Sequence, residues 1–434
     1  MRSDARMKTE LHRIMKLARA KKEEKVINVL HLLGNEQNLA ECFHELKRGK
    51  ASGVDGVTTE EYEADLEENL RGLIQRMKTW SYRPQPVQRV YIEKENGKKR
   101  ALGIPTIEDK VVQMGIKEIL EAVYEPEFLG CSYGFREGRG CHHALKALDK
   151  MIRYENVNYV IDADIRGFFD NVSHEWLVRF IEHRVGDKGL IRLIRRVLRS
   201  GVMEEGKFHA EETGTPQGGV VSPTFANIYL HYALDLWVEK IVKRRCNGYV
   251  GIVRYADDFV ICVEKEEEAK KILGVLRKRL AKFGLELADE KTRLIKFRRK
   301  SDSSGTFTFL GFTHYTSNTR VVGRRTAKTR FARSLKALSD WLKSMIITPV
   351  KDWWSVLCMK VNGHYRYYGI TGNARWLSLY AYRVRRLVKK WLERRSQRSR
   401  MGWAKLNAYF ARFPLPKPRT YINLFLVEQR EAIT

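Results

Sequence analysis

Two adjacent acidic residues on a short turn are the feature that most constrains this chain. Asp257 and Asp258 lie between two apolar runs, Tyr249 to Val253 and Phe259 to Val263, so the pattern predicts a β-hairpin with both carboxylates at its tip. Charge flanked by buried strands is costly and needs a metal ion or a basic partner to remain ionised. A third acid, Asp164, ends a similar strand-like run. We therefore expect the three carboxylates to hold two magnesium ions.

Such an arrangement suits nucleotidyl transfer. Joining a nucleotide to a 3′-hydroxyl requires one ion to activate the attacking oxygen and another to steady the leaving pyrophosphate. Magnesium prefers hard oxygen ligands and keeps several waters, so a few carboxylates and the substrate phosphates suffice. An Asp-Asp pair alone is a weak signal, because such pairs are common on solvated turns. The flanking strand patterns favour the metal site.

The net charge points to a polyanionic partner. The chain has 81 Lys plus Arg against 52 Asp plus Glu, a net charge of +29 over 434 residues. Counterion release from nucleic acid would supply a large share of the affinity, whereas a membrane surface would also require an amphipathic anchor or a lipidation signal. Neither is found in the sequence. We expect nucleic acid, and no membrane, as the partner.

Length and cysteine usage indicate a globular cytoplasmic protein of two to four domains. Six scattered cysteines include no C-x-x-C pair, so the sequence predicts neither a zinc site nor a disulfide framework. The N-terminal segment lacks the apolar core of a signal peptide, and no later stretch is apolar enough to span a bilayer.

Three segments have the character of nucleotide or phosphate contacts. Lys94 and Arg100 lie on a predicted hairpin that could fold over a triphosphate, with a solvated basic turn as the alternative. Lys47 and Lys50 begin a glycine-rich basic loop, for which an ordinary linker is the alternative. Gln217 lies in a Gly-Gly turn bracketed by prolines, before a helix predicted over residues 224–236; its amide suits contact with a base pair, although such a glutamine is more often solvated.

Several ordered blocks resemble those of the bacterial group II intron reverse transcriptases, also called maturases. The resemblance runs from about Lys47 to Pro418 and depends on the joint order of the blocks. They are Gly53–Val57, Leu102–Thr106, Lys110–Gln113, Ser132–Arg136, Asp164–Asp170, Thr215–Pro223 and Tyr255–Asp258.

The resemblance implies a role for each matching position. The metal ligands fall on Asp164, Asp257 and Asp258, with the backbone carbonyl of Ile165 a further ligand and manganese a substitute for magnesium. Other matching positions would contact the nucleotide, template or primer. They are Lys94 and Arg100 for the nucleotide, Gln217 for template and nucleotide, Phe169 for exclusion of the 2′-hydroxyl, Lys291 for primer or phosphate, and Gly311 in the primer grip. For Phe169, a role for its neighbour Phe168 and a purely structural role stay open.

From about residue 324 the pattern turns helical and strongly basic. Between Arg375 and Arg400, ten Lys or Arg face one acid, Glu393, and we expect this segment to grip RNA or a template–primer duplex. The positions expected to do so are Arg383, Arg386 and Lys390. Residues 401–434 contain no histidine or cysteine, so we expect no HNH endonuclease there, while a reduced DNA-binding element stays open.

The predicted fold is α+β, a right-hand polymerase with a central antiparallel sheet and a helical thumb. Expected divisions are a basic helical extension (1–60), fingers and palm (61–320), thumb (321–400) and a short C-terminal segment (401–434). The resemblance implies an RNA-directed DNA polymerase that uses deoxynucleoside triphosphates, an RNA template with a DNA primer, its group II intron RNA and a target DNA, and that assists splicing and retrotransposition. Two alternatives stay open: an intron-independent reverse transcriptase in repair or phage defence, and an RNA-binding splicing cofactor that has lost synthesis.

Overall fold

A computed structural model describes most of the chain. The residues described are 5–93, 99–204, 206–209, 213–215, 218–297, 305–316, 322–395 and 402–425. Helices and mainly antiparallel sheets occur together, which is the expected α+β class. The chain forms two compact units. The first comprises Met1–Gly140, Ala163–Ile261 and Glu267–Thr292, and the second comprises Cys141–Asp162, Cys262–Glu266 and Arg293–Thr434.

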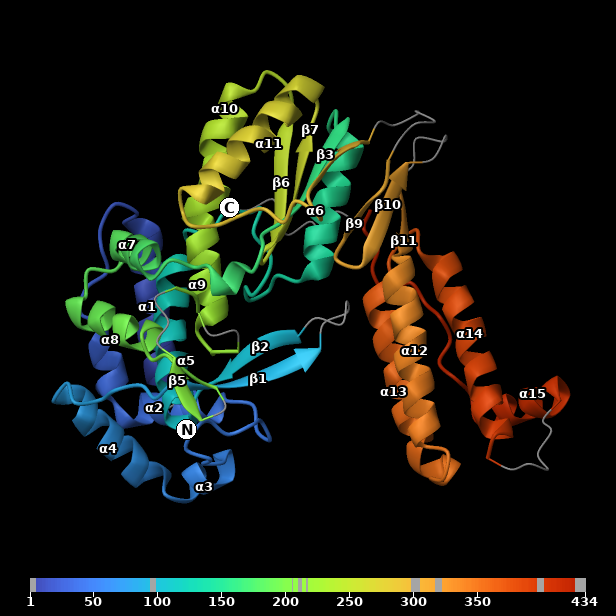
Figure 1. Cartoon of the computed structure of the whole chain (residues 1–434), viewed down its shortest axis with the longest axis horizontal. Helices are drawn as coiled ribbons and strands as arrows, with labels where there is room; N and C mark the ends of the chain where they lie inside the picture. The colour runs from blue at the N-terminus through green and yellow to red at the C-terminus, as the bar shows by residue number, and fades with distance from the viewer. Residues whose placement is uncertain are drawn as a thin grey trace. The chain divides into compact units, whose positions relative to one another are not determined.

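Helices make up most of the first unit. They are α1 (Ala5–Ala20), η1 (Leu30–Gly34), α2 (Glu36–His44), α3 (Thr59–Ala64), α4 (Leu66–Lys78), α5 (Ile107–Tyr124), η2 (Phe168–Asp170), α7 (His174–Arg184), α8 (Lys188–Leu198), α9 (Ser222–Leu230), η3 (His231–Asp235), η4 (Val238–Val242), α10 (Lys243–Arg245) and α11 (Glu266–Ala281). Helix α5 lies at the centre of the core (Figure 1), because nearly all its apolar residues are buried. Its N-terminus is capped by Thr106, whose side chain accepts a hydrogen bond from the Asp109 backbone N–H.

The expected basic hairpin forms one edge of a sheet in this unit. Strands β1 (Val87–Glu93) and β2 (Lys99–Ile104) pair antiparallel, with Ile92 opposite Arg100. Strands β4 (Val202–Glu204) and β5 (Lys207–His209) complete the order β2-β1-β4-β5. The hairpin is confirmed, although Lys94, like Gln217, lies outside the described residues.

A second four-stranded sheet carries the acidic residues. Its strands are β6 (Val250–Tyr255), β7 (Asp258–Val263), β3 (Tyr159–Asp164) and β8 (Arg293–Lys296), in the order β6-β7-β3-β8. Strands β3 and β7 each contribute residues to both units. Five of the six residues of β7 are buried, and the sixth is Asp258 at its start. The hairpin predicted around Asp257 and Asp258 is therefore confirmed.

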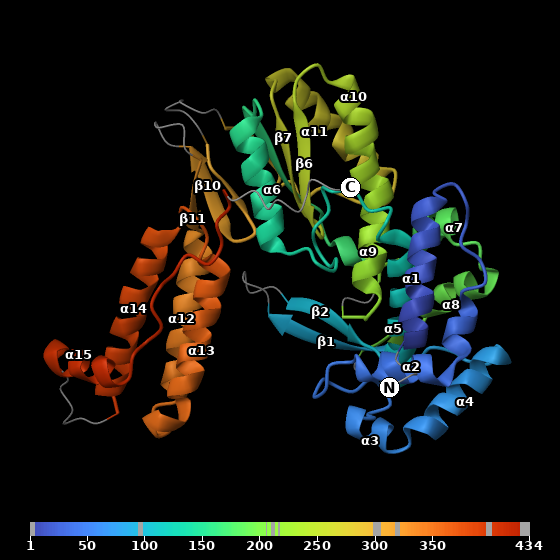
Figure 2. The same cartoon turned by 180° about the vertical axis from the view of Figure 1, so that it is seen from behind.

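The second unit combines a small sheet with a helical bundle. Its elements are α6 (Cys141–Tyr154), β9 (Phe307–Phe309), β10 (Phe312–Thr316), β11 (Val322–Thr326), α12 (Lys328–Ser344), α13 (Val350–Tyr368), α14 (Ala374–Glu393) and α15 (Trp403–Arg412). Helices α12, α13 and α14 lie side by side in both views (Figure 1 and Figure 2), around a core that includes Leu338, Leu357, Val384 and Val388. The helical segment begins at Lys328, slightly later than expected.

Two helical predictions were wrong in extent. Apolar residues at helical spacing from Leu11 to Leu33 predict a helix up to Gly34, but residues 22–29 do not continue α1, because Val26 forms a parallel bridge with Val185. The helix predicted over residues 224–236 begins at Ser222 and passes into two π-helical turns, the second ending at Val242.

Candidate active site

The turn between β6 and β7 holds its two carboxylates in a constrained backbone. Ala256 has a φ of 58°, a left-handed conformation that is unfavourable for a residue with a side chain. Its carbonyl oxygen accepts a hydrogen bond of 3.0 Å from Nη1 of Arg254. Asp257 and Asp258 are both partly exposed. The turn thus presents two hard oxygen donors at the end of a buried hairpin.

Asp164 is held at the end of β3 by backbone pairing with the segment after α11. Ile165 forms an antiparallel bridge with Leu287, and the Ala288 N–H donates to the carbonyl oxygen of Asp164 at 2.8 Å. The Arg166 N–H donates to the carbonyl of Glu286, so neither adjacent ladder bond uses the Ile165 carbonyl. That carbonyl is the group expected to help bind metal.

Lys291 lies directly against Asp164. Its Nζ forms an ion pair and hydrogen bond with Oδ2 of Asp164, and this contact raises the pKa of Lys291. Lys291 and Asp164 lie 127 residues apart in the sequence. The structure brings the two together.

Electrostatics connect Asp257 with the same group of residues. Burial raises the pKa of the Asp257 carboxyl, and the negative charge of Asp164 raises it further, whereas Arg100 and Lys291 lower it. Arg100 on β2 is exposed, so its guanidinium is available to a ligand. Four of the predicted residues therefore share one electrostatic neighbourhood.

The donor chemistry fits a hard divalent cation. Within the described residues, no three His, Cys, Asp or Glu side chains already form a ready-made metal cluster. Magnesium does not need one, because it is usually bound by one or two carboxylates together with waters and substrate phosphates. The negative charges of Asp164 and Asp257 repel each other, and a bound cation would relieve this repulsion.

The structure distinguishes the two adjacent phenylalanines. Phe168 is buried and packs edge-on against Tyr229, with 6.3 Å between the ring centroids. Phe169 is partly exposed and borders a cavity of about 300 Å³, which is also lined by Leu102 and Gly103 of β2. This placement favours Phe169 over Phe168 for contact with a nucleotide.

A buried ionic network behind the turn was missed by the sequence analysis. Arg254, which is fully buried, donates to both carboxylate oxygens of Asp235 at 2.7 and 2.6 Å. It also donates to Oδ1 of Asn227 at 3.0 Å, to Oγ of Ser132 at 2.7 Å, and to the carbonyl of Ala256. An arginine inside an apolar strand, immediately before the acidic turn, was the available signal.

Gly134 brings a further segment against the same turn. A Cβ atom at this position would lie 2.4 Å from the backbone nitrogen of Ala256, so only glycine permits the approach. The carbonyl of Gly134 accepts a hydrogen bond of 2.8 Å from Nδ2 of Asn227. The Ser132–Arg136 block thus has a structural role, because it packs against the acidic turn and supports it.

The remaining predicted positions lie on exposed or turn segments. Lys47 and Lys50 are exposed in the loop after α2. In the second unit, Gly311 and Leu310 both have positive φ, 78° and 49°, and form the tight turn between β9 and β10. The Leu310 carbonyl accepts a hydrogen bond of 3.0 Å from the Tyr367 hydroxyl.

Basic residues cover the outer face of α14. Arg383, Arg386 and Lys390 are exposed, while Val384 and Val388 of the same helix are buried in the bundle core. Such a helix offers a row of cations that nucleic-acid phosphates could contact.

Comparisons with known proteins agree with this geometry. The family described as "Reverse transcriptase (RNA-dependent DNA polymerase)" matches residues 92–314, just over half of the chain. Group II intron-encoded protein LtrA of Lactococcus lactis subsp. cremoris is 35% identical over 274 residues, 60% of this chain and 45% of LtrA. Protein YkfC of Escherichia coli (strain K12) is 32% identical over 271 residues, 55% of this chain and 71% of YkfC.

A solved structure of telomerase from Candida albicans is a looser match, with 13% identity and a TM-score of 0.43 over 81% of this chain and 64% of that one. The alignment with LtrA spans less than half of that relative's length. Among the described residues, no helix has the length and apolar character needed to cross a membrane.

Proposed function

Because this chain belongs to the reverse transcriptase (RNA-dependent DNA polymerase) family, we propose that it synthesises DNA on an RNA template. Membership also confirms the right-hand polymerase class expected from the sequence, and the likeness to LtrA confirms the resemblance to group II intron-encoded proteins. We further propose that the chain binds its intron RNA, assists its splicing and copies it during retrotransposition into a target DNA.

One observation carries the catalytic proposal: Lys291 forms an ion pair with Asp164, and the charges of Asp164, Arg100 and Lys291, which come from distant segments, all act on the pKa of Asp257. The family uses a divalent metal. Asp164, Asp257 and Asp258 would hold two magnesium ions, with Ile165 contributing its carbonyl and manganese able to substitute. When bound, the ions would supply activation of the primer 3′-hydroxyl and neutralisation of the leaving pyrophosphate.

The surrounding residues position the substrates. Arg100 donates its forked N–H groups to triphosphate oxygens, and Lys94 adds a second cation from the same hairpin. Phe169 fills the space that a ribose 2′-hydroxyl would need, which selects deoxynucleotides. Gln217 lies against template and nucleotide, and Lys291 moves from Asp164 to a primer or nucleotide phosphate.

A second set of residues binds the nucleic acids along their phosphates. Lys47 and Lys50 contact phosphates from the loop after α2, and Gly311 lets the primer backbone approach closely. The exposed face of α14 contacts the duplex through Arg383, Arg386 and Lys390. The net charge of +29 supports RNA and template–primer duplex as partners.

Primer extension on an RNA template, with magnesium and deoxynucleotides, tests the proposal. We expect the intact chain to extend the primer and the Asp257→Asn, Asp258→Asn variant to lose extension by several orders of magnitude. Glu175→Gln is the matched control, because it removes an exposed carboxylate that pairs with Arg179 on α7.

The assay also separates the alternatives. Tight, salt-sensitive RNA binding with no extension by the intact chain would replace the polymerase with a splicing cofactor. Extension without any stimulation of intron splicing would favour an intron-independent reverse transcriptase.

A further inference from the structure

Trp80 occupies a backbone position that normally belongs to glycine. Helix α4 ends in a Schellman motif, in which the Ser81 N–H donates to the carbonyl of Arg76 at 2.9 Å and the Trp80 N–H donates to that of Met77 at 3.1 Å. The residue at this point adopts a left-handed conformation, and Trp80 has a φ of 58°. A bulky side chain is disfavoured there. Trp80 therefore has an unfavourable backbone conformation, and its indole lies at the C-terminal end of α4.

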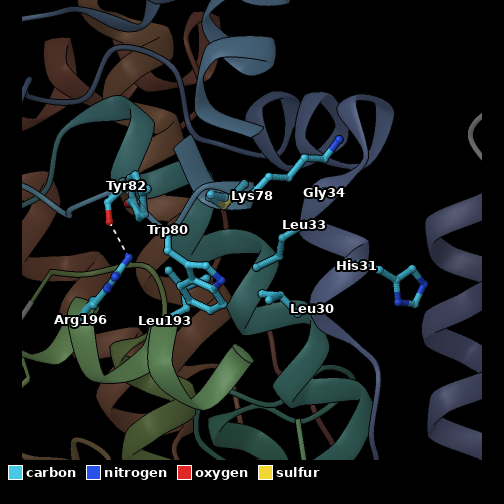
Figure 3. Close-up of a pocket in the computed structure, with 10 residues that line it drawn as sticks. Leu30, His31, Leu33, Gly34, Lys78, Trp80, Tyr82, Leu193 and Arg196 are labelled. Atoms are coloured by element: carbon cyan, nitrogen blue, oxygen red, sulfur yellow. Dashed lines mark hydrogen bonds between the residues drawn. The ribbon is translucent and has the colours of Figure 1, made fainter. Parts of the chain in front are cut away.

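The indole borders a cavity and is itself only partly buried. The cavity measures about 260 Å³ and has apolar walls formed by Leu30, Leu33, Met77 and Leu193. Figure 3 shows the Trp80 ring with Leu30 and Leu33 on one side and Tyr82 and Arg196 on the other. This volume lies just below the usual range for small-molecule sites, so the space suits a single planar ring system.

Three arginines gather around Trp80. The guanidinium carbons of Arg192 and Arg196 lie 4.4 and 5.3 Å from the indole centroid. Arg83 and Arg196 are anchored by hydrogen bonds of 2.8 Å to the carbonyls of Trp80 and Tyr82, respectively. In the part of the chain that the structure describes, no carboxylate forms a salt bridge with any of the three. Their mutual repulsion contributes, after burial, to a lowered pKa of Arg196. Among the described residues, the three arginines therefore have no carboxylate partner.

We propose that the cavity and the three arginines, together the Trp80 site, bind one unpaired nucleotide of an RNA loop outside the polymerisation centre. The base enters the apolar cavity and contacts the indole, while the adjacent phosphates bind the guanidinium groups. Loops and bulges of RNA present unstacked bases that aromatic side chains and arginines recognise. This inference relies on the proposed function for the identity of the polyanion as RNA.

Photocrosslinking tests the site directly. The probe is a single-stranded oligouridine of twelve nucleotides that carries 5-iodouridine, irradiated with the full chain in the presence of saturating template–primer duplex to occupy the polymerisation centre. We expect mass spectrometry to find the modified nucleotide on the peptide that contains Trp80. Crosslinks confined to other peptides would overturn the proposal.

Variants separate binding from folding. Trp80→Gly should weaken affinity for the oligouridine roughly ten-fold or more, because base stacking on the ring is lost. Trp80→Phe should retain most of the affinity. Since glycine tolerates the left-handed backbone, Trp80→Gly is expected to keep the thermal unfolding profile of the parent. Equal affinities for Trp80→Gly and the parent would contradict the inference.

Arg192→Gln with Arg196→Gln should flatten the dependence of log affinity on log salt by about 1.4, since each lost single-strand phosphate contact contributes about 0.7. Arg195→Gln is the matched control, because Arg195 lies on the same helix but pairs with Glu182 at 2.9 Å. If the control and the double variant behave alike, the arginines have no specific role.

The test distinguishes this inference from the proposed function. A crosslink at Trp80 without primer extension would contradict the proposed polymerase activity and support the RNA site. Primer extension without the crosslink would support the proposed polymerase activity and contradict the Trp80 site.

Discussion

The contact between Lys291 and Asp164 shows how a single residue can regulate the charge of the acidic site. In the protein alone, the ammonium partly neutralises a carboxylate that is expected to bind metal. The lysine side chain is 62% exposed, so the interaction is screened by solvent and the lysine can move away easily. Lys291 therefore competes with metal cations for the Asp164 carboxylate. When it moves away, its ammonium group can donate hydrogen bonds to a phosphate.

Lys291→Met should therefore tighten manganese binding to the protein without nucleic acid by severalfold, because one positive charge is removed beside the carboxylates. Titration followed by electron paramagnetic resonance measures this affinity. The same variant should need more template–primer for half-maximal extension. Lys282→Met, which removes another exposed lysine, is the control. Unchanged manganese affinity would contradict competition by Lys291.

Gly134 packs closely against the backbone of the acidic turn, so a larger residue there should displace the turn. Gly134→Ala places a methyl group 2.4 Å from the Ala256 nitrogen and 3.0 Å from the Tyr255 carbonyl carbon, and these are backbone atoms that cannot rotate away. We expect extension to fall at least ten-fold as the turn shifts. Gly130→Ala is the matched control, because its Cβ would meet nothing within 4 Å. Equal extension by both variants would show that the turn tolerates displacement.

At the scale of elements, one buried ion pair connects β6, the π-helical segment after α9 and the acidic turn. Arg254→Met alone leaves the Asp235 carboxylate buried without its partner, which typically costs about 3–5 kcal/mol. Arg254→Met combined with Asp235→Leu should recover most of the free energy of unfolding, because a buried ion pair is often replaceable by apolar residues.

Extension by this double variant should nevertheless stay low. The Ala256 carbonyl has lost the Arg254 donor in both variants, so the turn that carries Asp257 is no longer held. Denaturant titration and primer extension measure the two effects separately. Recovery of both stability and extension would show that Arg254 serves folding alone.

Packing of α12, α13 and α14 includes a buried histidine. His364 stacks on Tyr380 with 3.5 Å between ring centroids, its Nδ1 lies 3.0 Å from Oγ of Ser334, and burial lowers its pKa to about 4. The unfolded chain takes up this proton near pH 6.5 and the folded chain near pH 4, so His364 destabilises the fold progressively as the pH falls between these values.

His364→Phe should reduce the loss of thermal stability between pH 7 and pH 4.5, because the uncharged ring keeps the stack on Tyr380. Calorimetry at both pH values measures the change. His31→Phe is the control, since it makes the same replacement at an exposed position outside the bundle core. An identical pH dependence in His364→Phe and the parent would contradict this account.

At the scale of the whole molecule, an excess of 29 positive charges makes affinity for nucleic acid strongly salt-dependent. Replacing Arg383, Arg386 and Lys390 together by glutamine should flatten the dependence of log affinity on log salt by about 2 to 3, since each duplex phosphate contact contributes roughly 0.9. Lys389→Gln is the control, because Lys389 pairs with Glu393 on the same helix. Equal slopes for the triple variant and the control would move the nucleic-acid contact away from this face.

The sequence by itself determined the elements whose signals are local. The apolar runs on either side of the acidic turn predicted β6, β7 and the placement of Asp257 and Asp258. The run ending at Asp164 predicted β3, and the basic hairpin predicted β1 and β2. These predictions succeeded because apolar runs and the chemistry of turns depend on neighbours along the chain.

Only the tertiary structure decided the contacts between distant segments. It paired Arg254 with Asp235, seated Gly134 against Ala256, separated the buried Phe168 from the partly exposed Phe169, and gathered arginines of α8 around Trp80. Helix α1 also ends at Ala20, earlier than the apolar pattern predicts, because Val26 forms a parallel β-bridge with Val185. A buried charge or an unpaired backbone group is satisfied by whatever the fold brings near it, and no local pattern encodes that partner.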